Sequence, residues 1–584
     1  MNKNENKSIN VNIVLLPFSI FFVLFIYVFV SLIGTDIFYK KPIYITIITL
    51  LLVWLLIIFF LEKKHNTIKN NPKMFLFVFL MGIILGFFYV NQIWFSGYLN
   101  LLPLNSFFSG KTHRDTLYLT TIAESFSTNG YPSFLINEAP FIKYHYLSNL
   151  FISVISRILD IPCFITYNYL FHIIILPVFI LLLQIIVIDI RNEYGIQKQF
   201  QYIDYIFITC FLMGFNFVGL ADSIAHWYNS MIVSESCLMS IMFLLFAIKI
   251  VFVCKREYES RVLLKVLFIP FFIIILSGLK VSTGCIFFVL CSYYLFRKKI
   301  FDIKTWVLII VYSIIFLLSC KLFIRTDDFS YMMQTNENFG ILSKIHLFDF
   351  CRRYVGRKNL LLHYWFYLIP FCFIFLFQEK KINSFKMFIQ NDDYISKSVL
   401  ITMIAALIPG LILNIDAGNA FYFIIPSFVL LNLLILGKNI PYQFFSEIKG
   451  KHLILSFILV SLFIPEMIKS NIPSTIRELY SCKTSYNDLM SDEAYNSYVE
   501  ILSLTKGSKD DYCIMLSENA YIIKTYDERS DKIPRSPNNL IELAATGLYG
   551  INLINNEHDI NYAKALGKKK MILIIGDSYK IIDL

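Results

Sequence analysis

Residues 163–190 read CFITYNYLFHIIILPVFILLLQIIVIDI and contain one residue that is charged at neutral pH, Asp189. A helix needs about 20 mostly apolar residues to cross a bilayer, so this stretch is long enough. Similar stretches lie on both sides of it, and together they predict about 13 transmembrane helices. These are at 12–34, 43–61, 74–93, 163–190, 203–219, 236–253, 262–277, 281–296, 305–323, 361–377, 397–413, 420–436 and 452–469. The sequence therefore predicts an all-α polytopic membrane protein.

The composition supports a membrane protein and excludes other classes. Of the 584 residues, 57% are hydrophobic and 16% are charged, whereas soluble domains average about 45–50% and about 25%. Disorder requires low hydrophobicity and high net charge, so it is excluded as well. The abundance of Ile, Lys, Asn and Phe is typical of AT-rich bacterial genomes, and we expect a bacterial protein.

The net charge of +11 is unevenly distributed along the chain. Residues 470–584 hold 13 Lys and Arg against 16 Asp and Glu, a net −3, so residues 1–469 carry +14. With a cytoplasmic N-terminus, 21 basic residues fall in inner loops and 3 in short outer loops, as the positive-inside rule favours. We expect a multi-pass protein of the plasma (inner) membrane whose C-terminus is extracytoplasmic. The expected partners of its basic residues are anionic membrane lipids and not nucleic acid.

Two domains follow from this pattern. Residues 1–469 form the transmembrane domain, with large outer loops at 94–162 and 324–360. Within the first loop, the apolar run Leu147–Leu159 is too short to cross and predicts an interfacial helix on the outer side. Residues 470–584 have strand-length apolar runs at 512–516 and 571–575 and a helical pattern at 538–547, so they predict a small extracytoplasmic α/β domain.

The first outer loop contains the residues best suited to chemistry. Asp115, Tyr118 and Ile122 are spaced to share one helix face. A carboxylate there, close to the bilayer surface, suits a general base. A stabilising acidic residue at a helix N-terminus explains Asp115 as well. Tyr144 and His145 also lie in this loop, and interfacial aromatic residues are common for structural reasons.

The order of these features resembles the C-type glycosyltransferases, a superfamily of multi-pass enzymes that use lipid-linked sugar donors. The features are Asp115 on a loop helix, the turn Asn129-Gly130-Tyr131-Pro132, the segment Tyr144-His145-Tyr146-Leu147 and the turn Asp160-Ile161-Pro162. The superfamily usually has two prolines in the third feature, and this chain lacks both. The segment 544–550, AATGLYG, is similar to the tail of uncharacterised bacterial membrane proteins of glycosyltransferase type. The resemblance covers roughly residues 110–190.

The resemblance implies an inverting glycosyltransferase in which Asp115 is the catalytic base. Tyr118, Tyr144 and His145 are then expected to bind substrate. A cation is needed beside the departing phosphate, and the candidates are Lys280, Arg325, Arg352 and Arg353. Lys280 interrupts an apolar region, where an ionisable residue is usually functional, although snorkelling to the interface explains it equally. Interfacial anchoring is the alternative for Arg352 and Arg353.

The expected function is therefore transfer of a sugar from a polyprenyl-phosphate donor to a glycan, lipid or protein acceptor of the cell envelope, as in polysaccharide biosynthesis. We expect no cofactor and no metal site, although the adjacent pair Asp327 and Asp328 leaves a divalent ion open. Two other functions fit the same sequence. One is a transporter or flippase for lipid-linked saccharides, and the other is an arginine-dependent glycan polymerase or ligase that uses Arg352, Arg353 and Arg357.

Overall fold

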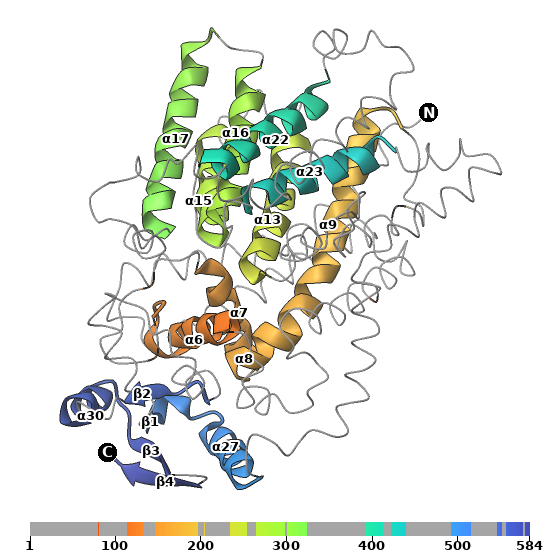
Figure 1. Cartoon of the computed structure of the whole chain (residues 1–584). Coiled ribbons are helices and arrows are strands. Elements are labelled where there is room, and N and C mark those ends of the chain that lie inside the picture. The colour runs from red at the N-terminus through yellow and green to blue at the C-terminus, as the bar shows by residue number, and fades with distance from the viewer. Residues whose placement is uncertain are drawn as a thin grey trace, which may run out of the picture. The chain divides into compact units, whose positions relative to one another are not determined.

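The computed structural model shows the chain as two compact units (Figure 1), Met1–Pro177 with Ser474–Leu584, and Val178–Pro473. The residues that it describes are 80, 114–133, 135, 142, 146–159, 161–196, 204, 234–253, 264–297, 301–323, 393–412, 422–439, 492–515, 546–551, 556–575 and 578–584. The domain boundary that we predicted at 469/470 lies outside these residues, so the division into 1–469 and 470–584 stays a prediction.

The segment 94–162, which we predicted to be the first outer loop and call by that name below, contains two helices of the first unit, α6 (Arg114–Asn129) and α7 (Leu147–Leu159). They are followed by α8 (Cys163–Ile165) and a π-helical turn (Thr166–Leu170), which leads into α9 (Phe171–Glu193). Helix α6 ends where Gly130 adopts a φ of 79°, a conformation that glycine tolerates without strain. The hydroxyl of Ser125 then fixes the turn, since it donates to the Tyr131 carbonyl at 2.9 Å and accepts from the Ser133 N–H at 2.8 Å.

The C-terminal residues form a four-stranded mixed sheet in the order β2-β1-β3-β4. Its strands are β1 (Tyr512–Met515), β2 (Tyr549–Ile551), β3 (Lys570–Ile575) and β4 (Ser578–Asp583). Strand β1 is parallel to both β2 and β3, and β4 returns antiparallel to β3. Helix α27 (Asp492–Thr505) precedes β1, and α30 (Asn556–Ala565) joins β2 to β3. The apolar runs at 512–516 and 571–575 thus form β1 and β3, whereas nearly all of 538–547 lies outside the described residues.

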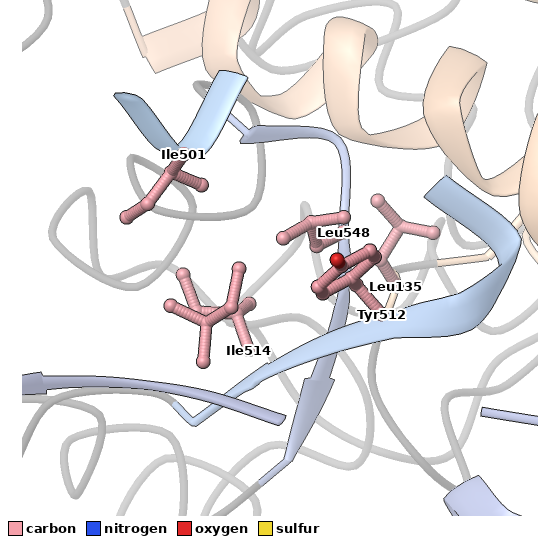
Figure 2. Packing of buried hydrophobic residues seen from close by; sticks show 6 residues of the cluster. Leu135, Ile501, Tyr512, Ile514 and Leu548 are labelled. Carbon is pink, nitrogen blue, oxygen red and sulfur yellow. The ribbon is translucent and has the colours of Figure 1, made fainter. Parts of the chain in front are cut away.

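The core on one side of this sheet includes a residue from the first outer loop. Leu135 is buried with Ile501 of α27, Tyr512 and Ile514 of β1, and Leu548, as Figure 2 shows. The carbonyl of Leu135 also accepts the N–H of Gly550 in β2 at 2.6 Å. The first outer loop and the C-terminal sheet therefore share one hydrophobic core.

The second unit is helical in the residues that the structure describes. Besides the end of α9 it contains α13 (Glu235–Val253), a π-helical turn (Leu264–Phe268), α15 (Ile269–Leu279), α16 (Val281–Phe296), α17 (Ile303–Phe323), α22 (Tyr394–Ile412) and α23 (Ile424–Gly437). Helices α15, α16 and α17 pack side by side, and α16 also packs on α22 (Figure 1). Aromatic rings fill these contacts: the rings of Phe288 and Phe316 are stacked 5.7 Å apart.

One end of this unit is held by a fully buried ion pair. The guanidinium of Arg191 lies 2.7 Å from the carboxylate of Asp204, and each side chain is 1% exposed. Arg191 also donates two hydrogen bonds, of 3.1 and 3.2 Å, to the carbonyl of Leu436 in α23. The end of α9 is thereby tied to the end of α23.

A second ion pair lies at the same helix ends. The carboxylate of Asp393, just before α22, accepts from Lys438 Nζ at 2.9 Å and from the Tyr194 hydroxyl at 2.7 Å. Ser396 adds its backbone N–H at 3.1 Å and its hydroxyl at 2.7 Å. Burial alone would raise the pKa of Asp393, but Lys438 and these donors together lower it below its ordinary 3.8.

The predicted polytopic fold with about 13 transmembrane helices is wrong. Among the described residues a single helix, α17, is long and apolar enough to cross a membrane, by length and composition alone. Other apolar stretches in that part of the chain form shorter helices, which are Leu147–Arg157, Lys265–Leu279, Val281–Phe296, Tyr394–Ala406 and Ile424–Gly437. Of the remaining predicted spans, those at 12–34, 43–61, 361–377 and 452–469 lie outside the described residues.

The prediction failed because hydropathy counts apolar residues without registering what covers them. The break at Lys280 was predicted correctly, since this residue has extended backbone angles (φ −159°, ψ 114°) and ends α15. Helix α7 has the bounds expected of the interfacial helix, yet Leu147, Leu150 and Ile152 are buried inside the protein. Burial against protein produces the same apolar pattern as burial in lipid.

Candidate functional site

Helix α6 carries two of the predicted site residues. Asp115 is its second residue, in the first turn, where the helix dipole favours a negative charge. Tyr118 lies one turn further along and is half-buried. The structure therefore brings Asp115 and Tyr118 onto the same helix, in the order Asp, Tyr, turn and second helix.

Glu124, in the middle of α6, is deeply buried. Its side chain is 3% exposed, and its carboxylate lies 3.7 Å from Lys509 Nζ. The same carboxylate accepts the backbone N–H of Cys163 at 2.6 Å, and so ties α6 to the start of α8. These contacts favour a structural role for Glu124.

Gly547 lies directly beside Glu124 and Lys509. Its φ is +66°, and a β-carbon built on it would lie 2.8 Å from Glu124 Oε2 and 2.6 Å from Lys509 Nζ. A side chain at this position would therefore collide with the ion pair. The glycine in AATGLYG thus has a packing reason, since the backbone of the C-terminal domain lies directly against the carboxylate of the first outer loop.

A further ion pair connects the same two regions at the surface. Arg157, near the end of α7, lies 3.2 Å from the carboxylate of Asp510. Both side chains are partly solvated, and exposed pairs of this kind contribute at most about 1 kcal/mol. The buried contacts of Glu124 and Leu135 therefore hold α6 and α7 against the C-terminal domain more strongly than this pair does.

The first turn of α7 contains a polar cluster that the sequence analysis did not identify. The side chains of Ser148 and Asn149 are buried, and within the described part of the chain their polar atoms have no hydrogen-bond partner. The ring of Tyr146, just before α7, lies 5.9 Å from that of Phe126 in α6. Burial raises the pKa of the Tyr146 phenol well above its ordinary value, so the phenol stays protonated at neutral pH.

Lys280 lies in the second unit, at the one-residue turn between α15 and α16. It is 7% exposed, and its Nζ lies 3.8 Å above the centre of the Tyr422 ring, a favourable cation–π contact. Its backbone is well bonded, because its N–H donates to Leu276 and its carbonyl accepts from Thr283 and Gly284. The predicted gap between the apolar spans 262–277 and 281–296 is therefore a tight, buried turn with the Lys280 cation at its apex.

Polar groups surround this turn. The buried hydroxyls of Ser277 and Ser282 have no hydrogen-bond partner among the described residues. Gly284 lets the first turn of α16 approach Ser277, since an added β-carbon would lie 2.9 Å from the Ser277 nitrogen. A lysine beside the N-terminus of a long helix can bind an anion, because the first N–H groups of the helix lack partners inside it.

The other predicted site residues lie outside the described part of the chain or are divided between the two units. Tyr144, His145, Arg325, Arg352 and Arg353 lie outside the described residues, as do Asp327 and Asp328. Asp115 and Tyr118 belong to the first unit and Lys280 to the second. In the described ranges no group of three or more His, Cys, Asp or Glu side chains is arranged to hold a metal. The expectation that no metal is needed stays a prediction.

The unpartnered side chains were missed for a simple reason. A single Ser or Asn in an apolar helix usually bonds to a backbone carbonyl one turn earlier, as Asn432 does to Phe428 at 2.8 Å. Nothing in the sequence separates Asn149 from that case. The one available signal was its position in the first turn of α7, where no helical carbonyl precedes it.

Comparison with known proteins adds no relative. No family model, no curated protein and no solved structure matches this chain. The resemblance to C-type glycosyltransferases therefore depends on the residues named above.

Proposed function

We propose that this protein is a membrane glycosyltransferase that moves a sugar from a polyprenyl-phosphate donor to a cell-envelope acceptor on the outer face. One observation carries the proposal. Asp115 lies in the first turn of α6, and α6 is followed by a glycine turn, by α7, and by Pro162 at the start of α8. This is the order of elements by which the sequence resembles the C-type superfamily.

In the proposed reaction the Asp115 carboxylate takes the proton of an acceptor hydroxyl. The acceptor oxygen forms a bond to the anomeric carbon of the donor, and the bond from that carbon to the phosphate oxygen breaks on the opposite side. The electron pair leaves with the polyprenyl phosphate, so no cofactor is needed. General-base catalysis of this kind contributes about 10²–10⁴-fold in rate.

Two further features support the proposal. Lys280, which belongs to the second unit, is a buried cation next to the first turn of α16, and a cation beside a helix N-terminus suits a phosphate group. Helix α17 exposes Ile303, Leu317 and Leu322 by more than half of their surface. Apolar side chains along an exposed helix favour contact with lipid, and we propose that the protein resides in the inner membrane.

The decisive experiment compares Asp115→Asn with a matched control in membranes from cells that lack the native protein. Asp302→Asn is the control, because Asp302 precedes α17 and accepts the Lys304 N–H at 3.0 Å, and Asn caps a helix equally well. We expect Asp115→Asn to reduce sugar transfer by about 10²–10⁴-fold, with an unchanged amount of folded protein. Asp302→Asn should retain activity.

The alternatives give different results. A transporter or flippase for lipid-linked saccharides would keep its activity in Asp115→Asn, and so would an arginine-dependent polymerase or ligase. The latter would instead lose activity in Arg352→Ala or Arg353→Ala. Lipid-linked saccharides extracted from cells without the protein should contain an accumulated donor, and its absence would contradict the transferase.

A further inference from the structure

The first turn of α7 has unused hydrogen-bonding capacity inside the protein. Ser148 is 0% and Asn149 1% exposed. The Ser148 hydroxyl and both polar atoms of the Asn149 amide lack a partner among the described residues. More than nine in ten buried polar groups in native proteins are hydrogen-bonded. Three unpaired atoms on adjacent residues therefore indicate a group that binds here.

Both residues lie in the first turn of α7, at the N-terminus of the helix. The first hydrogen bond at the start of α7 runs from the N–H of Leu150 to the carbonyl of Tyr146, at 3.0 Å. The N–H groups of Leu147, Ser148 and Asn149 precede it and have no carbonyl of the helix to meet. Side chains on a helix lean toward its N-terminus. The Ser148 and Asn149 side chains thus lean toward the end where these N–H groups point.

An aromatic side chain comes shortly before the polar groups in the chain. Tyr146 directly precedes α7, is 3% exposed, and holds its ring at 47° to that of Phe126. Ligand sites commonly combine apolar and aromatic walls with a few polar groups that fix the orientation of the ligand. The start of α7 has both components.

The chemistry of the unpaired atoms selects the ligand. The Asn149 carbonyl oxygen needs a donor, its amide nitrogen needs an acceptor, and the Ser148 hydroxyl serves either role. A fully ionised phosphate offers only acceptors and would leave the carbonyl oxygen unpaired. Neighbouring hydroxyl groups both donate and accept. We propose that the first turn of α7 is a saccharide-binding subsite in which Ser148 and Asn149 hold sugar hydroxyls.

The subsite deepens the proposed function and rests on it for the choice of a saccharide over other polyols. A buried water molecule could satisfy the same atoms. Removal of the polar groups should have different effects for a water molecule and for a saccharide. Loss of a water site affects the stability of the protein alone, whereas loss of a saccharide subsite affects binding and leaves the protein without saccharide as stable as before.

Binding is measured on the full-length protein in lipid nanodiscs or a zwitterionic detergent, because glycoside detergents carry sugars of their own. The probes are glucose, galactose and N-acetylglucosamine, detected by saturation-transfer NMR and by the shift in Tm. At least one probe should bind the parent protein saturably. Asn149→Leu and Ser148→Ala should weaken that binding by about tenfold or more, with an unchanged Tm in the absence of sugar.

Asn432→Leu is the matched control, since Asn432 lies on a buried helix but already donates to the Phe428 carbonyl. It should lower Tm and leave sugar binding unchanged. The subsite is overturned if no probe binds the parent, or if Asn149→Leu binds as the parent does. It is also overturned if Asn149→Leu lowers Tm without sugar as much as Asn432→Leu. Should Asn149→Leu not fold, Ser148→Ala decides by the same criteria.

The outcome is independent of the catalytic test. Asp115→Asn should bind the probe with the affinity of the parent protein even though turnover is lost. Normal sugar binding combined with an active Asp115→Asn variant would reject the proposed catalytic base and retain the subsite. Absent binding combined with an inactive Asp115→Asn variant would do the reverse.

Discussion

The two ends of the helical unit Val178–Pro473 use buried polar side chains in opposite ways. Where α9 and α23 finish, Arg191 pairs with Asp204 and Lys438 pairs with Asp393. Where α15 turns into α16, the hydroxyls of Ser277 and Ser282 lack a partner among the residues described. Paired groups fix helices to one another, whereas unpaired groups add polarity without adding a bond. The first end is thus stabilised by ion pairs, whereas the second holds hydroxyl groups that a ligand of the proposed reaction would find unpaired.

The largest effect is expected at the paired end. Arg191→Met removes one partner of a fully buried ion pair, which typically costs about 3–5 kcal/mol. Denaturation of the purified protein should show this loss in the free energy of unfolding. The double variant Arg191→Met with Asp204→Leu should recover most of it. If the double variant is as unstable as the single one, the pair is not the source of the effect.

A smaller, pH-dependent effect is expected for Asp393→Asn. The folded pKa of Asp393 is below its unfolded value, so the ionised carboxylate stabilises the fold above an unfolded pKa of about 4. This contribution is lost as the pH falls through the folded pKa. At pH 7 the variant should be about 2–3 kcal/mol less stable than the parent. The difference should shrink below pH 4, and a constant difference down to pH 3 would refute the assignment.

At the end beside Lys280, a substitution should affect substrate binding more than stability. Lys280→Met keeps the aliphatic packing and removes the charge, so it should change Tm less than Arg191→Met. Because hydrogen bonds to charged groups are worth about 1.5–3 kcal/mol, the variant should raise the KM for a polyprenyl-phosphate sugar by roughly 10- to 100-fold. An unchanged KM in a normally folded protein would identify Lys280 as a purely structural cation.

The smallest effect is expected for Ser282→Ala. Its hydroxyl has no partner in the described part of the chain, so its removal should change the free energy of unfolding by less than about 0.5 kcal/mol. Ser427→Ala is the matched comparison, since the Ser427 hydroxyl donates to the Ile424 carbonyl at 2.8 Å. That variant should lose about 1 kcal/mol. Equal losses in the two variants would show that a bonded hydroxyl and an unpartnered one contribute equally to stability.

Local elements were predictable from the sequence because their causes are local. An apolar run and the residues that end it were enough to predict three features. These are the bounds of α7, the strands at Tyr512 and Met571, and the break at Lys280. The number of membrane-spanning helices was not predictable in this way. Apolar side chains that face other helices, such as Phe243 in α13 and Phe272 in α15, leave the same pattern as side chains that face lipid.

The sequence did not predict contacts in the candidate site between residues that are distant in the chain. The sequence placed Asp115 and Tyr118 on one helix, and the structure agrees. Nothing in it linked Glu124 to Lys509, because the two are separated by most of the chain. Equally, the lack of a partner for Asn149 depends on what surrounds it in space. A buried side chain and its partners become known only when the tertiary packing is known.

The place of Leu135 in the core of the C-terminal sheet has a consequence for how the protein is made. A ribosome that adds 5–20 residues per second needs roughly 20–80 s to proceed from Leu135 to Leu548. During that time the loop with Asp115 has been synthesised, but the sheet that buries its leucine does not yet exist. Residues of the C-terminal sheet, which are translated much later, thus complete the segment that bears the proposed catalytic base. A chain terminated before β1 would expose Leu135 to solvent and to the quality-control machinery of the cell.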